Sequence, residues 1–105
     1  MIRVVLCTVP QNRAEAMARA LVNNRLCACV NIVPAVKSVY RWEGKISQNV
    51  ESLMVIKTTE EAFPALADFI KSHHPYSVPE IIALPVSDGN PDYMRWVEGS
   101  VRGQK

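Results

Sequence analysis

The chain has 105 residues, which is enough for one domain with a single hydrophobic core and too few for two domains. Hydrophobic side chains make up 49% of the residues and charged ones 21%, a composition that is typical of folded proteins and excludes a disordered chain. The 12 Lys and Arg exceed the 10 Asp and Glu by two and form no basic run, which argues against nucleic-acid binding. We therefore expect residues 1–105 to form one domain that has no nucleic-acid partner.

No segment predicts a membrane protein or a secreted, disulfide-bonded one. The apolar stretch at residues 4–9 is far shorter than a membrane span, and no small-residue cleavage site follows it. The three cysteines, Cys7, Cys27 and Cys29, are an odd number, and a Cys-x-Cys pair cannot easily bond to itself. A fourth cysteine for a closed zinc site is also missing. These features predict reduced thiols and a cytoplasmic location.

The first quarter of the chain predicts a strand and then a helix. Residues 2–9 are β-branched and apolar, and Pro10 ends this predicted strand. Asn12 and Glu15 have the spacing of a capping box. Apolar residues then recur at helical spacing as far as Arg25, so we expect a helix with one apolar face.

The next segment predicts a long hairpin. Residues 27–42 favour a strand, with a bulge or edge position at Pro34, and residues 50–58 return as its partner after turn residues 43–45. Sixteen residues at about 3.3 Å each would span roughly 53 Å, whereas a domain of this size has a radius of gyration of about 13 Å. The hairpin should therefore project, and its apolar side chains should be covered by another copy of the chain, giving a homo-oligomer.

The second half predicts a helix, a strand and a final helix. Thr58 and Glu61 have capping-box spacing, so the helix should begin at about residues 59–62 and end near residues 73–74, because Pro75 disfavours helical geometry before it. Its apolar stripe consists of Phe63, Leu66, Ala67 and Ile70. Residues 80–86 form the last predicted strand, with an edge position at Pro85. Asn90 and Pro91 are typical of the start of a helix.

This order of elements predicts an α+β protein with a ferredoxin-like βαββαβ sandwich, a long projecting hairpin and an extra C-terminal helix. In that topology the first strand and the second helix both run antiparallel to the third strand, so their C-terminal ends lie at the same end of the sheet. Cys7, late in the first strand, and His73 and His74, at the end of the second helix, are thereby brought into one neighbourhood.

A thiol and two imidazoles form a ligand set that suits copper or zinc and not magnesium or calcium. However, a cysteine in an apolar strand is usually a small core residue, and the helix dipole favours histidine at a helix C-terminus without any metal. Adjacent histidines also diverge by about 100° on a regular helix, so both reach one ion only where the helix has unwound. Pro75 permits such unwinding. The residues alone leave both interpretations open.

Other polar and aromatic residues give weaker signals. Glu80 is a candidate pocket carboxylate, general base or metal ligand, or a solvated charge at a strand end. Lys57 is more typical of a long side chain that reaches solvent than of a catalytic amine. The larger aromatic side chains frame either a small-molecule cleft or subunit contacts: Tyr40, Trp42, Tyr76, Tyr93 and Trp96. No catalytic triad, glycine-rich phosphate loop or close carboxylate pair is present, so no enzyme is predicted.

Several segments together resemble the CutA family, the divalent-cation tolerance proteins. They include LCTVP at 6–10, NRLCACVNIVP at 24–34, SVYRWEGKI at 38–46, VIKTT at 55–59, HPYSVPEIIALPV at 74–86 and YMRWV at 93–97. The resemblance implies a ferredoxin-like subunit that assembles as a homotrimer with the architecture of PII signal proteins. It also implies a cytoplasmic protein linked to tolerance of copper and other divalent cations.

For bacterial members the resemblance places copper ligands at the cysteine of the LCT segment and at the paired histidines. These positions are Cys7, His73 and His74 in this chain, so the resemblance implies Cu(2+), or less selectively other divalent cations, as the bound ion. The alternative is a PII-like signalling or small-ligand-sensing trimer, whose clefts between subunits would be bordered by Lys57, Tyr76 and Glu80. A third alternative is a structural scaffold that presents partner proteins.

Overall fold

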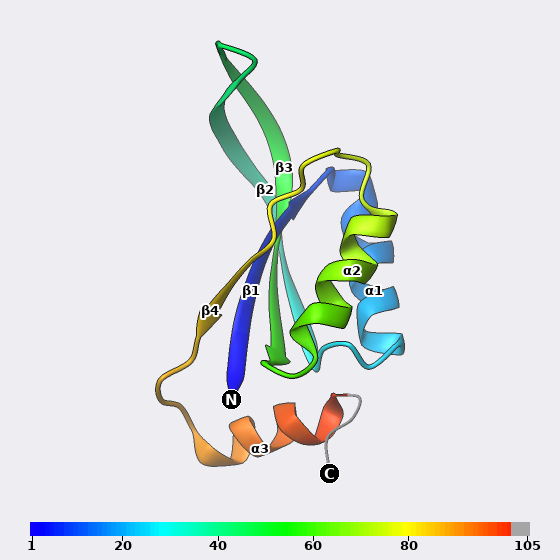
Figure 1. The fold of residues 1–105 in the computed structure, drawn as a ribbon, viewed down its shortest axis with the longest axis vertical. Coiled ribbons are helices and arrows are strands. Elements are labelled where there is room, and N and C mark those ends of the chain that lie inside the picture. The colour runs from blue at the N-terminus through cyan, green and yellow to red at the C-terminus, as the bar shows by residue number, and fades with distance from the viewer. Residues whose placement is uncertain (102–105) are drawn as a thin grey trace.

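The computed structural model describes residues 1–101 and contains one antiparallel sheet with two helices packed on it (Figure 1). The strands are β1 (Ile2–Val9), β2 (Cys29–Trp42), β3 (Lys45–Thr59) and β4 (Ile82–Pro85). The helices are α1 (Ala14–Asn23), which follows a short 3-10 turn (Gln11–Arg13), α2 (Phe63–His73) and α3 (Pro91–Ser100). The strand order is β2-β3-β1-β4, so β1 is central and the predicted ferredoxin-like α+β fold with an added C-terminal helix is confirmed.

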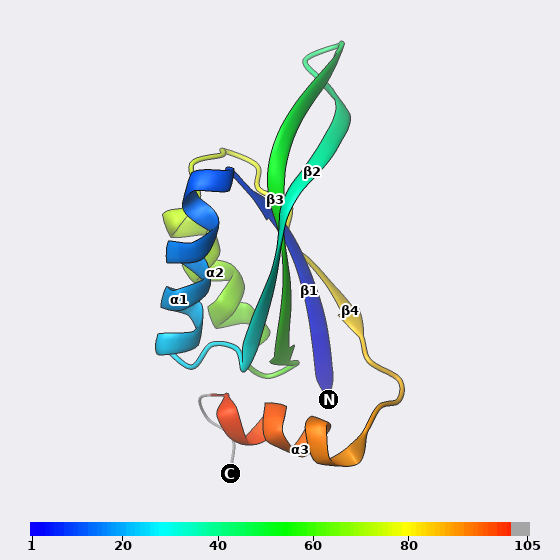
Figure 2. The same cartoon turned by 180° about the vertical axis from the view of Figure 1, so that it is seen from behind.

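The main core lies between the sheet and helices α1 and α2, which are on the same side of the sheet in both views (Figures 1 and 2). Val5, Cys7 and Val9 alternate along β1 and are fully buried. Leu66 and Ile70 of α2 are also fully buried, so the predicted helical stripe does face the core. Helix α3 lies across the end of the sheet where β1 begins. No helix within residues 1–101 is long and apolar enough to cross a membrane.

The β2–β3 hairpin extends beyond the rest of the sheet, as predicted. The described chain measures 46 × 26 × 22 Å, and the hairpin forms one end of its long axis (Figure 2). The pairing register shifts between Val33 and Val36, which confirms the bulge at Pro34 on this edge strand. The Pro34 carbonyl accepts hydrogen bonds from Gln11 Nε2 at 3.1 Å and Ser52 Oγ at 2.8 Å, so side chains from outside β2 hold the bulge in place.

Some predicted boundaries were wrong. The Asn12 capping box does not form, because the chain first makes a 3-10 turn in which the Arg13 N–H donates to the Pro10 carbonyl. The Thr58 hydroxyl donates to the Leu26 carbonyl at 2.7 Å and so does not cap α2. Strand β3 begins at residue 45, five residues before the predicted start, because the mostly polar residues 45–49 complete the backbone ladder with β2. Strand β4 is shorter than predicted, since it pairs only with residues 3–6 of β1.

The sheet face opposite α1 and α2 is apolar and is not covered by a helix of the described chain over most of its length. Directly paired residues of antiparallel strands project from the same face, and the pairs Val4–Leu84, Leu6–Ile82, Leu6–Val55 and Leu53–Val33 all lie on this side. We call these seven residues the open face. Ile82 and Leu84 are each about half exposed, so this face leaves a substantial apolar surface in contact with water.

The hairpin ends in a two-residue turn in which both residues have positive φ, 50° at Glu43 and 79° at Gly44. This is the turn geometry that matches the twist of a β-hairpin, and it disfavours residues with a β-carbon. A Cβ at Gly44 would meet no described atom within 4 Å, so only the backbone conformation opposes a larger residue there.

We expect Gly44→Ala to lower the free energy of unfolding by about 1 kcal/mol, because alanine is strained at positive φ. Glu43→Asn should raise it, because asparagine tolerates this conformation better. Urea unfolding at a fixed chain concentration measures both effects. Gly99→Ala is the control: a Cβ there also meets no described atom, but Gly99 lies in helix α3, where alanine is favoured. Equal losses at Gly44 and Gly99 would contradict the turn assignment.

Candidate functional site

The topology brings the side chains of Cys7 and His74 to the same backbone carbonyl oxygen, that of Thr8. His74 follows the last residue of α2, and its Nε2 lies 2.8 Å from the carbonyl oxygen of Thr8 in β1. The Cys7 Sγ lies 3.7 Å from the same oxygen. The predicted neighbourhood at this end of the sheet is therefore real for Cys7 and His74, across a sequence separation of 66 residues between the histidine and Thr8.

The hydrogen bonds of His74 define its tautomer. A carbonyl oxygen only accepts, so Nε2 must carry the proton that it donates to Thr8. The Tyr76 backbone N–H donates to Nδ1 at 3.1 Å, so Nδ1 carries the lone pair. Both ring nitrogens of this buried, neutral imidazole are therefore engaged. A metal ion can bind His74 only by replacing one of these two partners.

His73 points away from the other two residues. Its ring stacks on Phe69 with centroids 4.1 Å apart, and its Nδ1 donates to the Phe69 carbonyl at 2.8 Å. Nε2 has no hydrogen-bond partner among the described residues and is open to a ligand, because the side chain is exposed. A backbone carbonyl on one nitrogen is the usual way to orient a metal-binding imidazole. The guanidinium of Arg13, however, donates to the His73 carbonyl at 2.8 Å and places positive charge nearby.

The Cys7 thiol is fully buried, and this burial raises its pKa to about 12, with smaller contributions from the carboxylates of Glu80 and Glu51. The thiolate that binds metals is therefore strongly disfavoured in the metal-free chain. Residues 1–101 contain no group of three or more His, Cys, Asp and Glu side chains placed to hold one ion. The chain thus brings Cys7 and His74 together and leaves His73 on the neighbouring surface.

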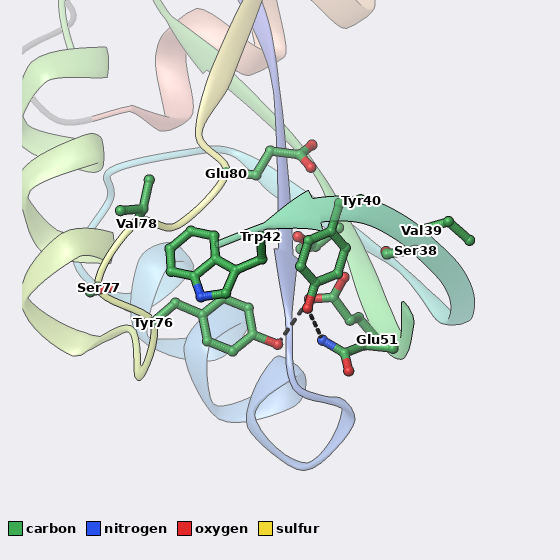
Figure 3. A pocket seen from close by; sticks show the side chains of 11 residues that line it. Ser38, Val39, Tyr40, Trp42, Glu51, Tyr76, Ser77, Val78 and Glu80 are labelled. Carbon is green, nitrogen blue, oxygen red and sulfur yellow. Dashed lines mark hydrogen bonds between the residues drawn. The ribbon is translucent and has the colours of Figure 1, made fainter. Parts of the chain in front are cut away.

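A cavity of about 650 Å³ lies between the β2–β3 hairpin and the segment that follows α2 (Figure 3). This volume is in the range of small-molecule sites, roughly 300–1,000 Å³. The hairpin contributes Ser38, Val39, Tyr40, Trp42, Asn49 and Glu51; the other lining residues are Thr8, Tyr76, Ser77, Val78 and Glu80. Tyr76 and Glu80 thus border a cavity within one chain, whereas the small-ligand alternative predicted clefts between subunits. Lys57, the third residue named for those clefts, does not line this cavity and instead hydrogen-bonds to Asn31.

Glu51 is a buried carboxylate in this cavity wall, with 5% of its surface exposed. The Tyr76 hydroxyl donates to Glu51 Oε1 at 2.9 Å. Burial raises the pKa of Tyr76 to about 12, and the hydrogen bond to Glu51 adds to this effect, so the hydroxyl keeps its proton at neutral pH. Glu51 was not predicted as a site residue. Alternation along β3 places it on the face of Leu53 and Val55, but its burial depends on the contact with Tyr76.

The fold and the site together define the class of protein. It is a ferredoxin-like subunit in which His74 hydrogen-bonds to the end of β1, next to a cavity lined by aromatic and acidic side chains. Solved structures with this fold cover nearly the whole chain. The divalent cation tolerance protein from Thermus thermophilus superposes with a TM-score of 0.94 at 49% identity, covering 96% of this chain and 99% of that one. CutA1 from Oryza sativa gives a TM-score of 0.95 at 43% identity, covering 98% of this chain and 95% of that one.

Sequence comparison identifies the family. The family described as CutA1 divalent ion tolerance protein matches residues 3–100. The divalent-cation tolerance protein CutA of Thermus thermophilus is 52% identical over 95 residues, which are 90% of this chain and 92% of that protein. Protein CutA of Mus musculus is 52% identical over 86% of this chain, which spans 51% of the mouse protein. The chain belongs to the CutA1 family of divalent ion tolerance proteins, as the sequence resemblance implied.

The two histidines differ in how much they stabilise the fold. We expect His74→Ala to lower the free energy of unfolding by about 2 kcal/mol, because it removes the imidazole that hydrogen-bonds to the partly buried Thr8 carbonyl and Tyr76 N–H. His73→Ala, the matched control in an exposed position, should cost less than about 1 kcal/mol. Urea unfolding followed by circular dichroism at one chain concentration compares them. A larger loss at His73 than at His74 would contradict the assigned hydrogen bonds.

Proposed function

We propose that this CutA1 family member is a cytoplasmic homotrimer that binds Cu(II), and less selectively other late divalent cations, through Cys7, His73 and His74. It acts by binding and does not turn over a substrate. The single observation that supports this proposal best is the Thr8 carbonyl, which is shared by the Cys7 thiol and the His74 imidazole. An ion between the sulfur and Nε2 would take the place of this oxygen as their common partner.

The ligands would act in different ways. His74 would lose the Nε2 proton or change tautomer, and Cys7 would release its thiol proton, because both must offer a lone pair to the ion. His73 has Nε2 available and would approach once the last turn of α2 opens. The helix already ends at His73, and His74 has an extended backbone with ψ of 138°, so little helix must unwind. The name shared by the relatives, divalent-cation tolerance protein, agrees with such a role.

The open face supports assembly. An exposed apolar sheet face of this kind is typical of a subunit interface. The projecting hairpin adds exposed Ile46 and Val50 on the same molecule. A closed ring of identical subunits covers these surfaces without leaving new ones exposed. The family resemblance favours three subunits.

The cytoplasmic location rests on the cysteines. Cys7, Cys27 and Cys29 are all free thiols, and two of them are buried where oxidation would disturb the core. Relatives carry other locations in their names, such as the periplasmic divalent cation tolerance protein CutA of Archaeoglobus fulgidus and the chloroplastic Protein CutA 1 of Oryza sativa. The free thiols of this chain are what support the proposed cytoplasmic location.

A second candidate function, the binding of a small signalling molecule, is favoured by the 650 Å³ cavity. Its aromatic and carboxylate lining is preformed, and Tyr76 and Glu51 are already hydrogen-bonded to each other. The burial of Cys7 also disfavours a freely accessible metal site. This function would use the trimer in the manner of PII proteins and needs no physiological metal.

The metal proposal predicts that Cu(II) binds to the parent protein with one ion per chain in titration calorimetry. A Cys7→Ala, His73→Ala, His74→Ala variant should bind at least about tenfold more weakly, since even outer-shell partners of a metal contribute this much. Because the pKa of Cys7 is raised to about 12, its proton must be released at neutral pH. The apparent affinity should therefore rise about tenfold per pH unit between pH 7 and pH 9.

Cys27→Ala is the matched control, because burial raises the pKa of this thiol to about 12 as well but it lies outside the proposed site. It should leave copper affinity unchanged. Circular dichroism establishes that each variant is folded before titration. Equal copper affinity in the parent and the folded triple variant would remove the metal proposal.

The assembly proposal predicts a sedimentation mass three times the 11.7 kDa of one chain at micromolar concentration. Leu84→Lys, which places a charge on the open face, should shift the protein toward smaller species. Val22→Lys is the control: Val22 is similarly exposed, at 41% against 49% for Leu84, but lies on α1 away from the open face. A monomeric parent protein, or dissociation by Val22→Lys alone, would contradict assembly through this face.

A further inference from the structure

The cavity walls carry a distinct combination of groups. Figure 3 shows the rings of Tyr40, Trp42 and Tyr76 around the same space, with the Glu51 side chain beside Tyr40 and Glu80 on the other side. The hairpin supplies Tyr40, Trp42 and Glu51, and the segment after α2 supplies Tyr76 and Glu80. Two chain segments far apart in sequence thus contribute both aromatic faces and carboxylates to one cavity.

The charge of the cavity is opposite to that of the chain. Glu51 and Glu80 are the charged residues that line it within the described part of the chain, and no Lys, Arg or His is among the lining residues. The whole chain has a formal charge of +2 at pH 7. The cavity is therefore a local concentration of negative charge, which attracts cations and repels phosphates and carboxylates.

Glu51 offers an oxygen to a ligand. Its Oε1 accepts the Tyr76 hydroxyl, while Oε2 forms no hydrogen bond with a described residue. No fully buried side-chain oxygen in the described chain lacks a partner, so Oε2 is not fully buried, and Glu51 is one of the residues that line the cavity. A carboxylate that is 95% buried and still presents one oxygen to a cavity is well placed to bind a hydrogen-bond donor that carries positive charge.

The walls suit an organic cation better than a metal ion. Hard metal ions take about six or more oxygen ligands, and the described residues contain no group of three His, Cys, Asp or Glu placed to hold an ion. Aromatic faces attract ammonium groups through their quadrupoles, most strongly at Trp. The rings of Trp42, Tyr40 and Tyr76 can surround the apolar part of such a ligand, while the Glu51 carboxylate accepts a hydrogen bond from its ammonium N–H.

We infer that the cavity binds a small organic ammonium ion, with its nitrogen at the Glu51 carboxylate and its apolar part against the rings of Trp42, Tyr40 and Tyr76. This inference rests on the second proposed function and names its ligand class. It is independent of the copper proposal, because none of Cys7, His73 and His74 lines the cavity.

The test uses three probes that differ in charge and share one ring: benzylammonium, benzyl alcohol and benzoate. The assembled protein carries Trp96→Phe, so that the fluorescence of Trp42 reports on the cavity without the exposed Trp96 of α3. We expect saturable quenching by benzylammonium, with an affinity at least about tenfold higher than for either other probe, because a charge-assisted hydrogen bond contributes roughly 1.5 kcal/mol or more.

Glu51→Gln should weaken benzylammonium binding about tenfold, since the amide keeps the shape and removes the charge. Glu80→Gln, at an exposed residue, should weaken it about threefold through the longer-range field. Glu61→Gln is the control, because Glu61 is an exposed glutamate that does not line the cavity. It should leave the affinity unchanged.

The possible outcomes distinguish the organic-cation inference from the more general proposal that the cavity binds a small molecule. Equal binding of benzyl alcohol or benzoate would overturn the cation inference and leave the small-molecule function standing. The absence of saturable quenching by all three probes would overturn both. Loss of binding in Glu61→Gln as large as in Glu80→Gln would show that net charge alone attracts the ligand, and would also overturn the assignment to this cavity.

Discussion

Strand β3 pairs with β1 on one side and with β2 on the other, and it is nearly twice as long as β1. Its C-terminal half lies in the compact sheet, where β1 and the helices bury Met54 and Ile56. Its N-terminal half has only β2 as a neighbour and carries the hairpin beyond the domain. This one strand therefore connects the core, the open face and the cavity, because Glu51 lies where the two halves meet.

Hydrogen bonds from the segment after α2 to strands β1 and β3 hold the end of the sheet where β1 ends. His74 donates to the Thr8 carbonyl, and Tyr76, two residues later, reaches Glu51 on β3. Thr8 takes part in both the histidine contact and the cavity, since its carbonyl accepts a hydrogen bond from His74 and the residue also lines the cavity. The segment 74–80 is thus fixed at two points, and any ligand that displaces His74 from Thr8 acts on the same segment that forms one wall of the cavity.

Local signals predicted the fold well. Pro75 ends α2 at the expected residue, Asn90 accepts the Asp92 N–H as the expected N-cap of α3, and Pro34 produces the expected bulge. Each of these effects depends on the backbone of the residue itself or of its neighbours. The early start of β3 was not predictable in this way, because polar residues such as Gln48 and Asn49 are strand residues only through their pairing with β2.

The candidate site was only partly predictable, because several of its contacts depend on tertiary packing and not on local sequence. Topology alone brought Cys7 and His74 together, but the direction of His73 depends on its stacking with Phe69, which no spacing reveals. Glu51 escaped notice because a carboxylate in a strand usually faces solvent. Its burial follows from Tyr76, which comes from a segment 25 residues away, and a single sequence does not show that contact.

The bulge at Pro34 has a consequence for the outer edge of the sheet. β2 is a long edge strand, and a regular edge of this length would offer a continuous row of amides to any passing extended chain. Proline lacks one of those amides, and the shift in register between Val33 and Val36 bends the strand out of line. The edge is thereby divided into two short pieces, so that unlimited strand addition, the route to fibres, is interrupted within the subunit itself.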